Sequence, residues 1–182
     1  MATAVYVKDG DCFKHFVCFV PETDDKKCVF VDKKTVECKA FNNVDCVETV
    51  SFSECTCIKM SAFEDCKELK MVVWNGDENN DSTLLTNYTV ATVDNISIQY
   101  KAFKNCAKLQ AVVLPKVNGK ITIEKEAFAG CGELRTVVFG NAKDVDISEE
   151  AFIGCAKVTF VCASDSAAER YAREHGFRIV NF

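Results

Sequence analysis

Histidine and proline are scarce in this sequence, with two copies of each among 182 residues. With so few histidines, there is little scope for a Cys–His nucleophile pair or a histidine-rich metal site, because each needs an imidazole beside its other reactive groups. Paired carboxylates, a phosphate-binding loop and a catalytic triad do not stand out either. We therefore expect no catalytic residues, no cofactor, no metal and no enzymatic activity.

Basic clusters and long apolar runs are also missing. The net charge is −5, and no run of Lys and Arg resembles those that usually bind nucleic acid. No apolar stretch reaches the roughly 18 residues of a membrane span, and residues 1–5 lack the basic-then-apolar profile of a signal peptide. The sequence therefore predicts no nucleic-acid partner and no membrane span, and it leaves the cellular compartment open.

Phenylalanine and cysteine are abundant, with 14 and 12 copies, and many of them belong to a repeat. Ala-Phe occurs five times, and apolar residues recur five positions before each Phe and six, nine and eleven positions after it. In the last repeat the final two places fall on Val161 and Ala163. The Phe residues are Phe41, Phe63, Phe103, Phe128 and Phe152, and four of them have Cys three positions later, at Cys66, Cys106, Cys131 and Cys155.

The spacing and alternation within each repeat predict a stacked solenoid. Apart from one step of 40 residues, successive Phe residues are 22 to 25 positions apart, which is within the range of one leucine-rich-repeat coil. Val112 and Leu114 alternate inward along a strand that Pro115 ends, and Ile121 and Ile123 predict a second short strand. One coil cannot bury its own apolar side, so neighbouring coils must stack. We predict parallel strands near 17–20, 47–52, 69–74, 109–114, 134–139 and 158–162.

The pattern Ala-Phe-x-x-Cys-x-x-Leu-x-x-Val-x-Leu-Pro, followed by Ile-x-Ile, resembles the BspA-like leucine-rich repeats. The resemblance covers about residues 35–163 and implies a right-handed, β-dominated α/β solenoid of five to six coils. We interpret residues 1–182 as a single leucine-rich-repeat domain. Residues 1–34 form a degenerate first coil or cap, and 75–94 form an insertion in which 84–93 is expected to add a strand.

The end of the chain, residues 164–182, also resembles the strand–helix–strand cap of such solenoids. Ser166 and Glu169 have the spacing of a capping box at the start of a helix. Gly176 follows His175 where the helix is expected to end, and residues 177–180 predict a last strand.

For the four repeat cysteines, burial as free thiols is the leading interpretation. Equivalent residues on adjacent coils lie about 4.8 Å apart, but their Cβ vectors run parallel, so a disulfide would twist the stack. Cysteine commonly packs as a small apolar side chain. Metal binding by Cys12, His15 and Cys18, or by Cys55 and Cys57 on one face of a strand, is a weaker alternative that lacks a matching second half.

The outward positions of the main strand lie eight and ten residues after each Phe and carry no charged residue. Preference for β-branched residues in strands explains part of this pattern, but not Met71 or Phe160. A continuous apolar face on a soluble protein commonly marks an interaction site. We predict a binding face that includes Val17, Phe19, Met71, Val73, Ala111, Val113, Thr136, Val138 and Phe160.

Two hypotheses for function follow. The family resemblance implies a non-catalytic scaffold for a protein or glycan ligand, with adhesion at a cell surface or outside the cell. The alternative is an intracellular interaction scaffold, which the unpaired thiols and the absence of a signal segment favour.

Overall fold

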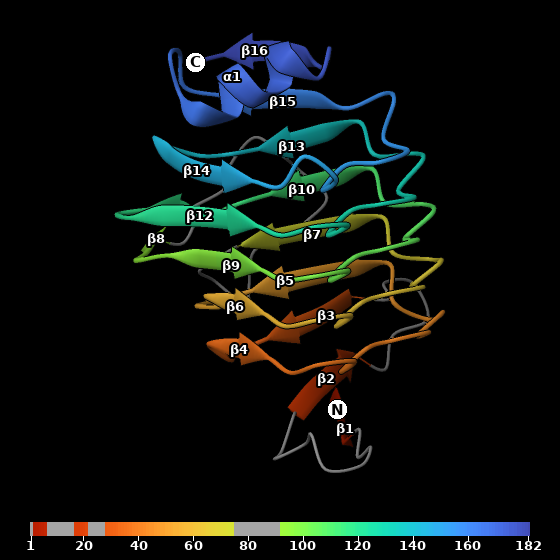
Figure 1. Cartoon of the computed structure of the whole chain (residues 1–182). Helices are drawn as coiled ribbons and strands as arrows, with labels where there is room; N and C mark the ends of the chain where they lie inside the picture. Colours follow the sequence, from red (N-terminus) through yellow and green to blue (C-terminus); the bar gives the residue numbers. More distant parts are fainter. Residues whose placement is uncertain (1, 7–16, 22–27, 75–91) are drawn as a thin grey trace.

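A computed structural model of the chain describes residues 2–6, 17–21, 28–74 and 92–182. Successive coils stack along one axis, and each contributes a strand to a long sheet and, in five coils, a strand to a shorter second sheet (Figure 1). The short strands agree with the repeat spacing, because the turns between them return the chain to the next coil. The predicted β-dominated solenoid is confirmed.

The long sheet has nine strands in the order β1-β2-β3-β5-β7-β10-β13-β15-β16. From β3 onward, neighbouring strands pair in parallel, with equivalent repeat positions side by side, such as Val72, Val112 and Val137. The strands are β1 Ala2–Tyr6, β2 Val17–Pro21, β3 Cys28–Val31, β5 Thr49–Phe52, β7 Met71–Trp74, β10 Ala111–Val113, β13 Thr136–Val138, β15 Thr159–Cys162 and β16 Arg178–Asn181.

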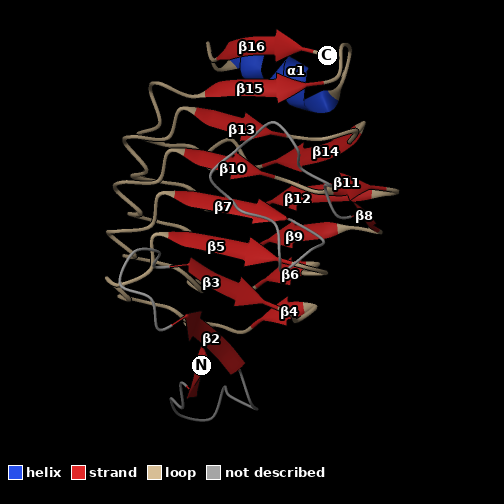
Figure 2. Cartoon of the chain, turned by 180° about the vertical axis from the view of Figure 1, so that it is seen from behind, coloured by secondary structure: helices blue, strands red, loops and turns tan. Residues whose placement is uncertain are grey.

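The second sheet has five parallel strands in the order β14-β12-β9-β6-β4. A further parallel pair, β8 and β11, lies beside it (Figure 2). The strands are β4 Thr35–Val36, β6 Cys57–Ile58, β8 Thr92–Val93, β9 Ile96–Ile98, β11 Lys116–Val117, β12 Lys120–Ile123 and β14 Asp144–Ile147. Of the strand expected at 84–93, the described residues contain only β8, and the rest of that segment lies outside them.

The prediction for the first parallel strand was wrong. Segment 17–20 lies in β2, which is antiparallel to both β1 and β3. The parallel stack begins instead with β3, which pairs with β5 from Cys28↔Thr49 to Val31↔Phe52. The six residues between β2 and β3 are too few for the crossover that joins parallel strands.

The five repeated phenylalanines form a continuous stack along the core. Successive ring centroids, from Phe41 to Phe152, are 4.7, 5.1, 5.2 and 5.1 Å apart, and the rings are within 9° of parallel. All five side chains are buried. Each coil therefore contributes one aromatic ring to a shared core that no coil could form alone.

Hydrogen bonds between coils hold the Ala-Phe turns in register. The amide of Phe103 donates to the carbonyl of Ala127 at 2.8 Å, and equivalent bonds join the other coils. Lys101, two residues before Phe103, and Asn105, two residues after it, both have a positive φ. Two positions after Phe the repeats use residue types that tolerate this left-handed conformation. They are Asn43, Asp65, Asn105, Gly130 and Gly154.

The last coil departs from the expected register. Val158 is buried as predicted, but one residue fewer separates it from the strand, so Phe160 pairs with Val137. Phe160 and Cys162 therefore occupy the inward positions that the repeat offsets assigned to Val161 and Ala163, and both are 0% exposed.

The predicted strand–helix–strand cap is confirmed. Helix α1, Ala167–Glu174, begins at Ser166, whose side chain accepts a hydrogen bond from the amide of Glu169 at 3.2 Å. The Glu169 carboxylate accepts one from the amide of Asp165 at 2.6 Å. Gly176 has a positive φ after the helix, and β16 then pairs in parallel with β15. The cap covers the C-terminal end of the stack of coils (Figure 1).

Candidate binding face

The outward side chains of the long sheet form two rows across its strands. The register places Thr49, Met71, Ala111, Thr136, Thr159 and Arg178 in the first row. The second row consists of Ser51, Val73, Val113, Val138, Val161 and Val180. Arg178, on the last strand, is the only charged residue in either row. The uncharged face predicted from the sequence is therefore continuous from β5 to β15.

Burial divides the second row into two parts. Ser51, Val73 and Val113 are 7%, 0% and 8% exposed, although Val73 and Val113 are outside the core cluster. Val138 and Val161 are half-buried, and Val180 is 52% exposed. Val73 and Val113 were predicted to be open to a partner, and the structure corrects this. In the second row, the accessible side chains therefore lie toward the C-terminal end of the stack.

We define the C-terminal patch as Thr136, Val138, Thr159, Val161 and Val180. These side chains lie on β13, β15 and β16, which pair directly with one another. Of the other predicted face residues, Met71 and Ala111 are half-buried and lie next to the patch along the first row.

Phe160 does not belong to this face, contrary to the prediction. Its ring lies 4.8 Å from that of Phe139 and 5.4 Å from that of Phe177, and it stacks with Tyr171 at 6.0 Å. The shortened last coil turns Phe160 inward, where it joins the core to the cap. For Val17 and Phe19 the structure describes the backbone of β2 but not the side chains, so their place on the face stays a prediction.

Charged residues border the face where the strands begin. Lys70 pairs with Glu48 at 2.6 Å across neighbouring coils, and Arg135 pairs with Glu133 at 2.8 Å. Such partly exposed pairs contribute little to stability. They do give the uncharged strand positions a polar rim, which is the usual anatomy of a protein interface.

The repeat is also found by comparison with known families. The chain matches the BspA type leucine rich repeat region, with six copies over residues 79–171, which is just over half its length. The chain belongs to the BspA-type leucine-rich-repeat family. Among curated proteins, none matches it.

A solved structure shares the fold of this BspA-type chain. "The Crystal structure of Pneumococcal vaccine antigen PcpA" superposes with a TM-score of 0.53 and 15% sequence identity. The match covers 89% of this chain and 43% of that one, so the BspA-type chain spans less than half the length of the antigen structure. At this identity the likeness establishes the solenoid fold alone.

The repeat cysteines of the BspA-type coils are buried free thiols, as predicted. Each Sγ donates a hydrogen bond to the carbonyl of a Phe in the preceding coil, at 3.0 to 3.2 Å. The thiol therefore satisfies a carbonyl in the turn as well as filling the core. Desolvation raises the pKa of Cys155 to about 12, and a hydrogen bond with Cys106 together with burial raises the pKa of Cys66 far above its usual value.

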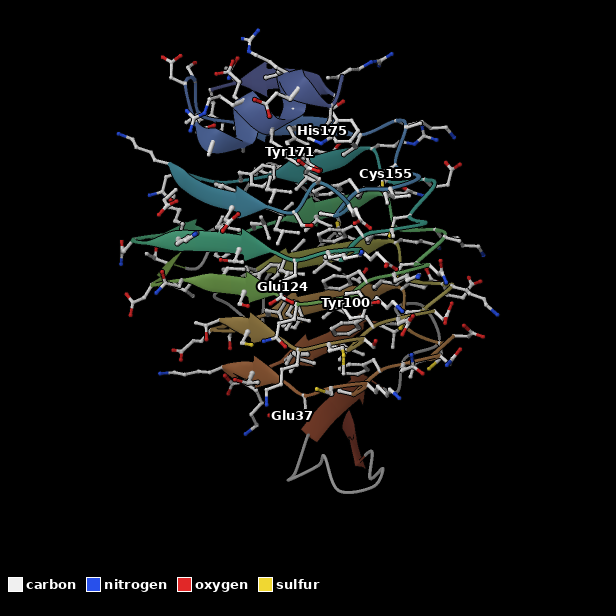
Figure 3. The ribbon with its side chains drawn as sticks, viewed as in Figure 1. Glu37, Tyr100, Glu124, Cys155, Tyr171 and His175 are labelled. Carbon is white, nitrogen blue, oxygen red and sulfur yellow. The ribbon has the colours of Figure 1, made fainter. Side chains whose placement is uncertain are left out.

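We expect these thiols to resist modification in the native protein. The thiolate is the reactive form. A raised pKa disfavours it at Cys66 and Cys106, through a hydrogen bond with the next repeat thiol and through burial. At Cys155, labelled in Figure 3, burial raises the pKa. An alkylating reagent at neutral pH should label exposed Cys46 quickly and these three only after unfolding, as measured by peptide mass spectrometry. Rapid native labelling of Cys106 would contradict the packing described here.

The cysteine pair weighed as a metal site does not share a face. Cys55 is buried and lies before β6, where its Sγ donates to the carbonyl of Cys57, whereas Cys57 is half-exposed on the second sheet. Cys12 and His15 lie outside the described residues, and the side chain of Cys18 is not described. Within the described ranges, no group of three metal-binding side chains comes together.

Within the same ranges, α1 is the only helix, and it is too short and polar to cross a membrane. The BspA-type chain is therefore a repeat scaffold that presents the C-terminal patch on β13, β15 and β16.

Proposed function

We propose that this BspA-type protein is a non-catalytic scaffold that binds a protein partner through the C-terminal patch. The observation that carries the proposal is the row Val138, Val161 and Val180, which is accessible on three paired strands while the equivalent positions of earlier coils are buried. A rigid sheet presents these side chains without loss of conformational freedom on binding, which favours affinity.

The chemistry of the patch favours a protein over a glycan. Its side chains are methyl-bearing Val and Thr, and sugars expose mainly hydroxyl groups that need hydrogen-bonding partners. Arg178 continues the first row next to Thr159, and arginine is enriched at protein interfaces. An apolar centre with a charged border suits a protein surface of similar composition.

Val161→Lys is expected to abolish partner binding without unfolding the protein. The side chain is half-buried and points outward from β15, so the ammonium group reaches water in the free protein and loses it in the complex. The affinity should fall by roughly 2 kcal/mol or more, measured by calorimetry with a partner first recovered by affinity capture from the native source.

The matched control is Ile153→Lys. Ile153 is an exposed apolar residue on the turn side of the last repeat, so the same charge is introduced away from the patch. Binding by this variant should equal that of the parent. If Val161→Lys retains every partner that the parent captures, the patch is not the binding surface.

A role in adhesion at a cell surface is the finer form of this proposal. It is supported by the family resemblance and by the description of a structural neighbour as a vaccine antigen. The nine described cysteines, all free, favour instead an intracellular scaffold. A free-thiol count on unfolded protein, prepared from its native source without reductant, separates the two. Twelve thiols support an intracellular scaffold, and paired cysteines support an oxidising compartment.

A further inference from the structure

Two adjoining hollows lie at the edge of the second sheet where β9, β12 and β14 begin, at the left of Figure 1. They enclose about 640 and 520 Å³ and share Asn95 and Lys120. We call them together the polar groove. The residues that matter here are Asp94, Asn95, Lys120, Asn141, Lys143 and Asp144.

Two asparagines in the polar groove are held by backbone amides of neighbouring coils. Asn95 Oδ1 accepts a hydrogen bond from the Lys120 amide at 2.8 Å, and Asn141 Oδ1 accepts one from the Val117 amide at 2.9 Å. Both residues are exposed, and neither Nδ2 donates to another described residue. The oxygen of each carboxamide is therefore fixed, which leaves an oriented N–H donor for a ligand.

Glycines bring the backbone close enough to hold these side chains. A Cβ at Gly119 would lie 2.4 Å from Asn95 Oδ1, so only glycine leaves room for that carboxamide. Gly140 precedes Asn141 with a φ of +53°, and a Cβ there would lie 2.8 Å from the Pro115 carbonyl. The two donors are thus preorganised by the backbone, as binding sites require.

The polar groove is lined by three lysines, Lys34, Lys120 and Lys143, and by two aspartates, Asp94 and Asp144. Lys120 pairs with Asp146 at 3.0 Å. With Asp146 counted, the three ammonium groups are matched by three carboxylates. The groove therefore has both donors and acceptors, and no net charge selects an ionic ligand. A group that both donates and accepts, such as a hydroxyl, matches this arrangement.

The described lining of the polar groove exposes no large apolar side chain. Ile96 and Val117 line the polar groove but are 2% and 4% exposed. Protein partners depend on aromatic and other large anchors, which this described lining does not offer. A hydrated ligand with many hydroxyl groups does not need such anchors.

We propose that the polar groove is a second binding site of this protein, for an uncharged oligosaccharide. Asn95 and Asn141 donate to sugar oxygens, and Asp94 and Asp144 accept from sugar hydroxyls. The site is separate from the C-terminal patch and does not depend on the function proposed for it. Because the described residues of the groove include no aromatic ring for stacking, binding is weak and in fast exchange.

The test is a nuclear magnetic resonance titration of the ¹⁵N-labelled chain with cellotetraose, maltotetraose, laminaritetraose and chitotetraose. At least one should give saturable shifts of the backbone amides of Val117 and Lys120 and of the side-chain amides of Asn95 and Asn141. If none of the four binds, or if only a sulfated tetrasaccharide does, the proposal is overturned.

Two conservative variants make the test specific. Asn95→Asp and Asn141→Asp keep the oxygen that accepts the backbone amide but remove the free N–H donor. Together they should weaken sugar binding about tenfold or more, as expected from the loss of two hydrogen bonds. A spectrum like that of the parent would show that a variant keeps the fold. If the double variant unfolds, the two single variants are titrated instead.

Gln110→Glu is the matched control, because it makes the same amide-to-acid change at an exposed position outside the polar groove. It should leave sugar binding unchanged. Val161→Lys should also leave it unchanged, so loss of partner binding and loss of sugar binding report on separate sites. Undiminished sugar binding by the double asparagine variant would overturn the assignment of the site.

Discussion

Phe128→Ala is expected to lower the free energy of unfolding by about 3–5 kcal/mol, as large-to-small changes in a packed core generally do. The Phe128 ring lies between Phe103 and Phe152, at 5.2 and 5.1 Å, and is fully buried. Its removal leaves a cavity between two coils, and neighbouring coils cannot close it without breaking the hydrogen bonds of their turns. Denaturant unfolding followed by circular dichroism measures the effect.

Phe182→Ala provides the control for this experiment. Phe182 is the most exposed large apolar residue among those described, at 66%, so its truncation should change stability by less than about 0.5 kcal/mol. A loss below about 1 kcal/mol for Phe128→Ala would mean that the ring is not part of a tightly packed stack.

Val73→Lys is expected to destabilise the protein by about 3 kcal/mol or more. Val73 points away from the core, and alternation alone would predict that a charge is tolerated there. Its side chain is nevertheless 0% exposed, and burial of an unpaired ammonium group is costly. Thermal and denaturant unfolding should both show the loss, and the variant is expected to express poorly.

The same substitution at Val161 provides the comparison. Val161 occupies the equivalent row position on β15 and is half-buried, so Val161→Lys should cost less than about 1 kcal/mol. Equal stability of the two variants would show that burial along the second row is uniform, and the division of the face into a covered and an open part would be wrong.

The repeats could be predicted from the sequence because each repeated apolar residue packs at the same inward position in every coil. Phe41, Phe63 and Phe103 recur at fixed distances from the strand residues, and stacked coils are the only arrangement that buries all of them. The buried thiols followed from the same argument, because an inward position in a parallel stack repeats its environment. The cap was predictable from the spacing of Ser166 and Glu169 and from Gly176.

The polar groove had no signal that the repeat analysis could detect. Asn95 and Asn141 occupy different places in their coils, and their roles depend on amides of the neighbouring coil. The left-handed residues two positions after each Phe were also missed. Asn43, Asp65, Asn105, Gly130 and Gly154 share a tolerance for positive φ, and that shared property was the available clue.

The sequence by itself determined the repeat unit, its inward residues and its closing cap, since local spacing and the need to bury apolar surface decide all three. Only the tertiary structure decided which outward residues are accessible. Val73 and Val161 are both valines in the second row of the face, yet Val73 is buried and Val161 is half-exposed. Alternation fixes the side of the sheet to which a residue points. Whether another part of the chain covers that side depends on contacts between residues far apart in the sequence.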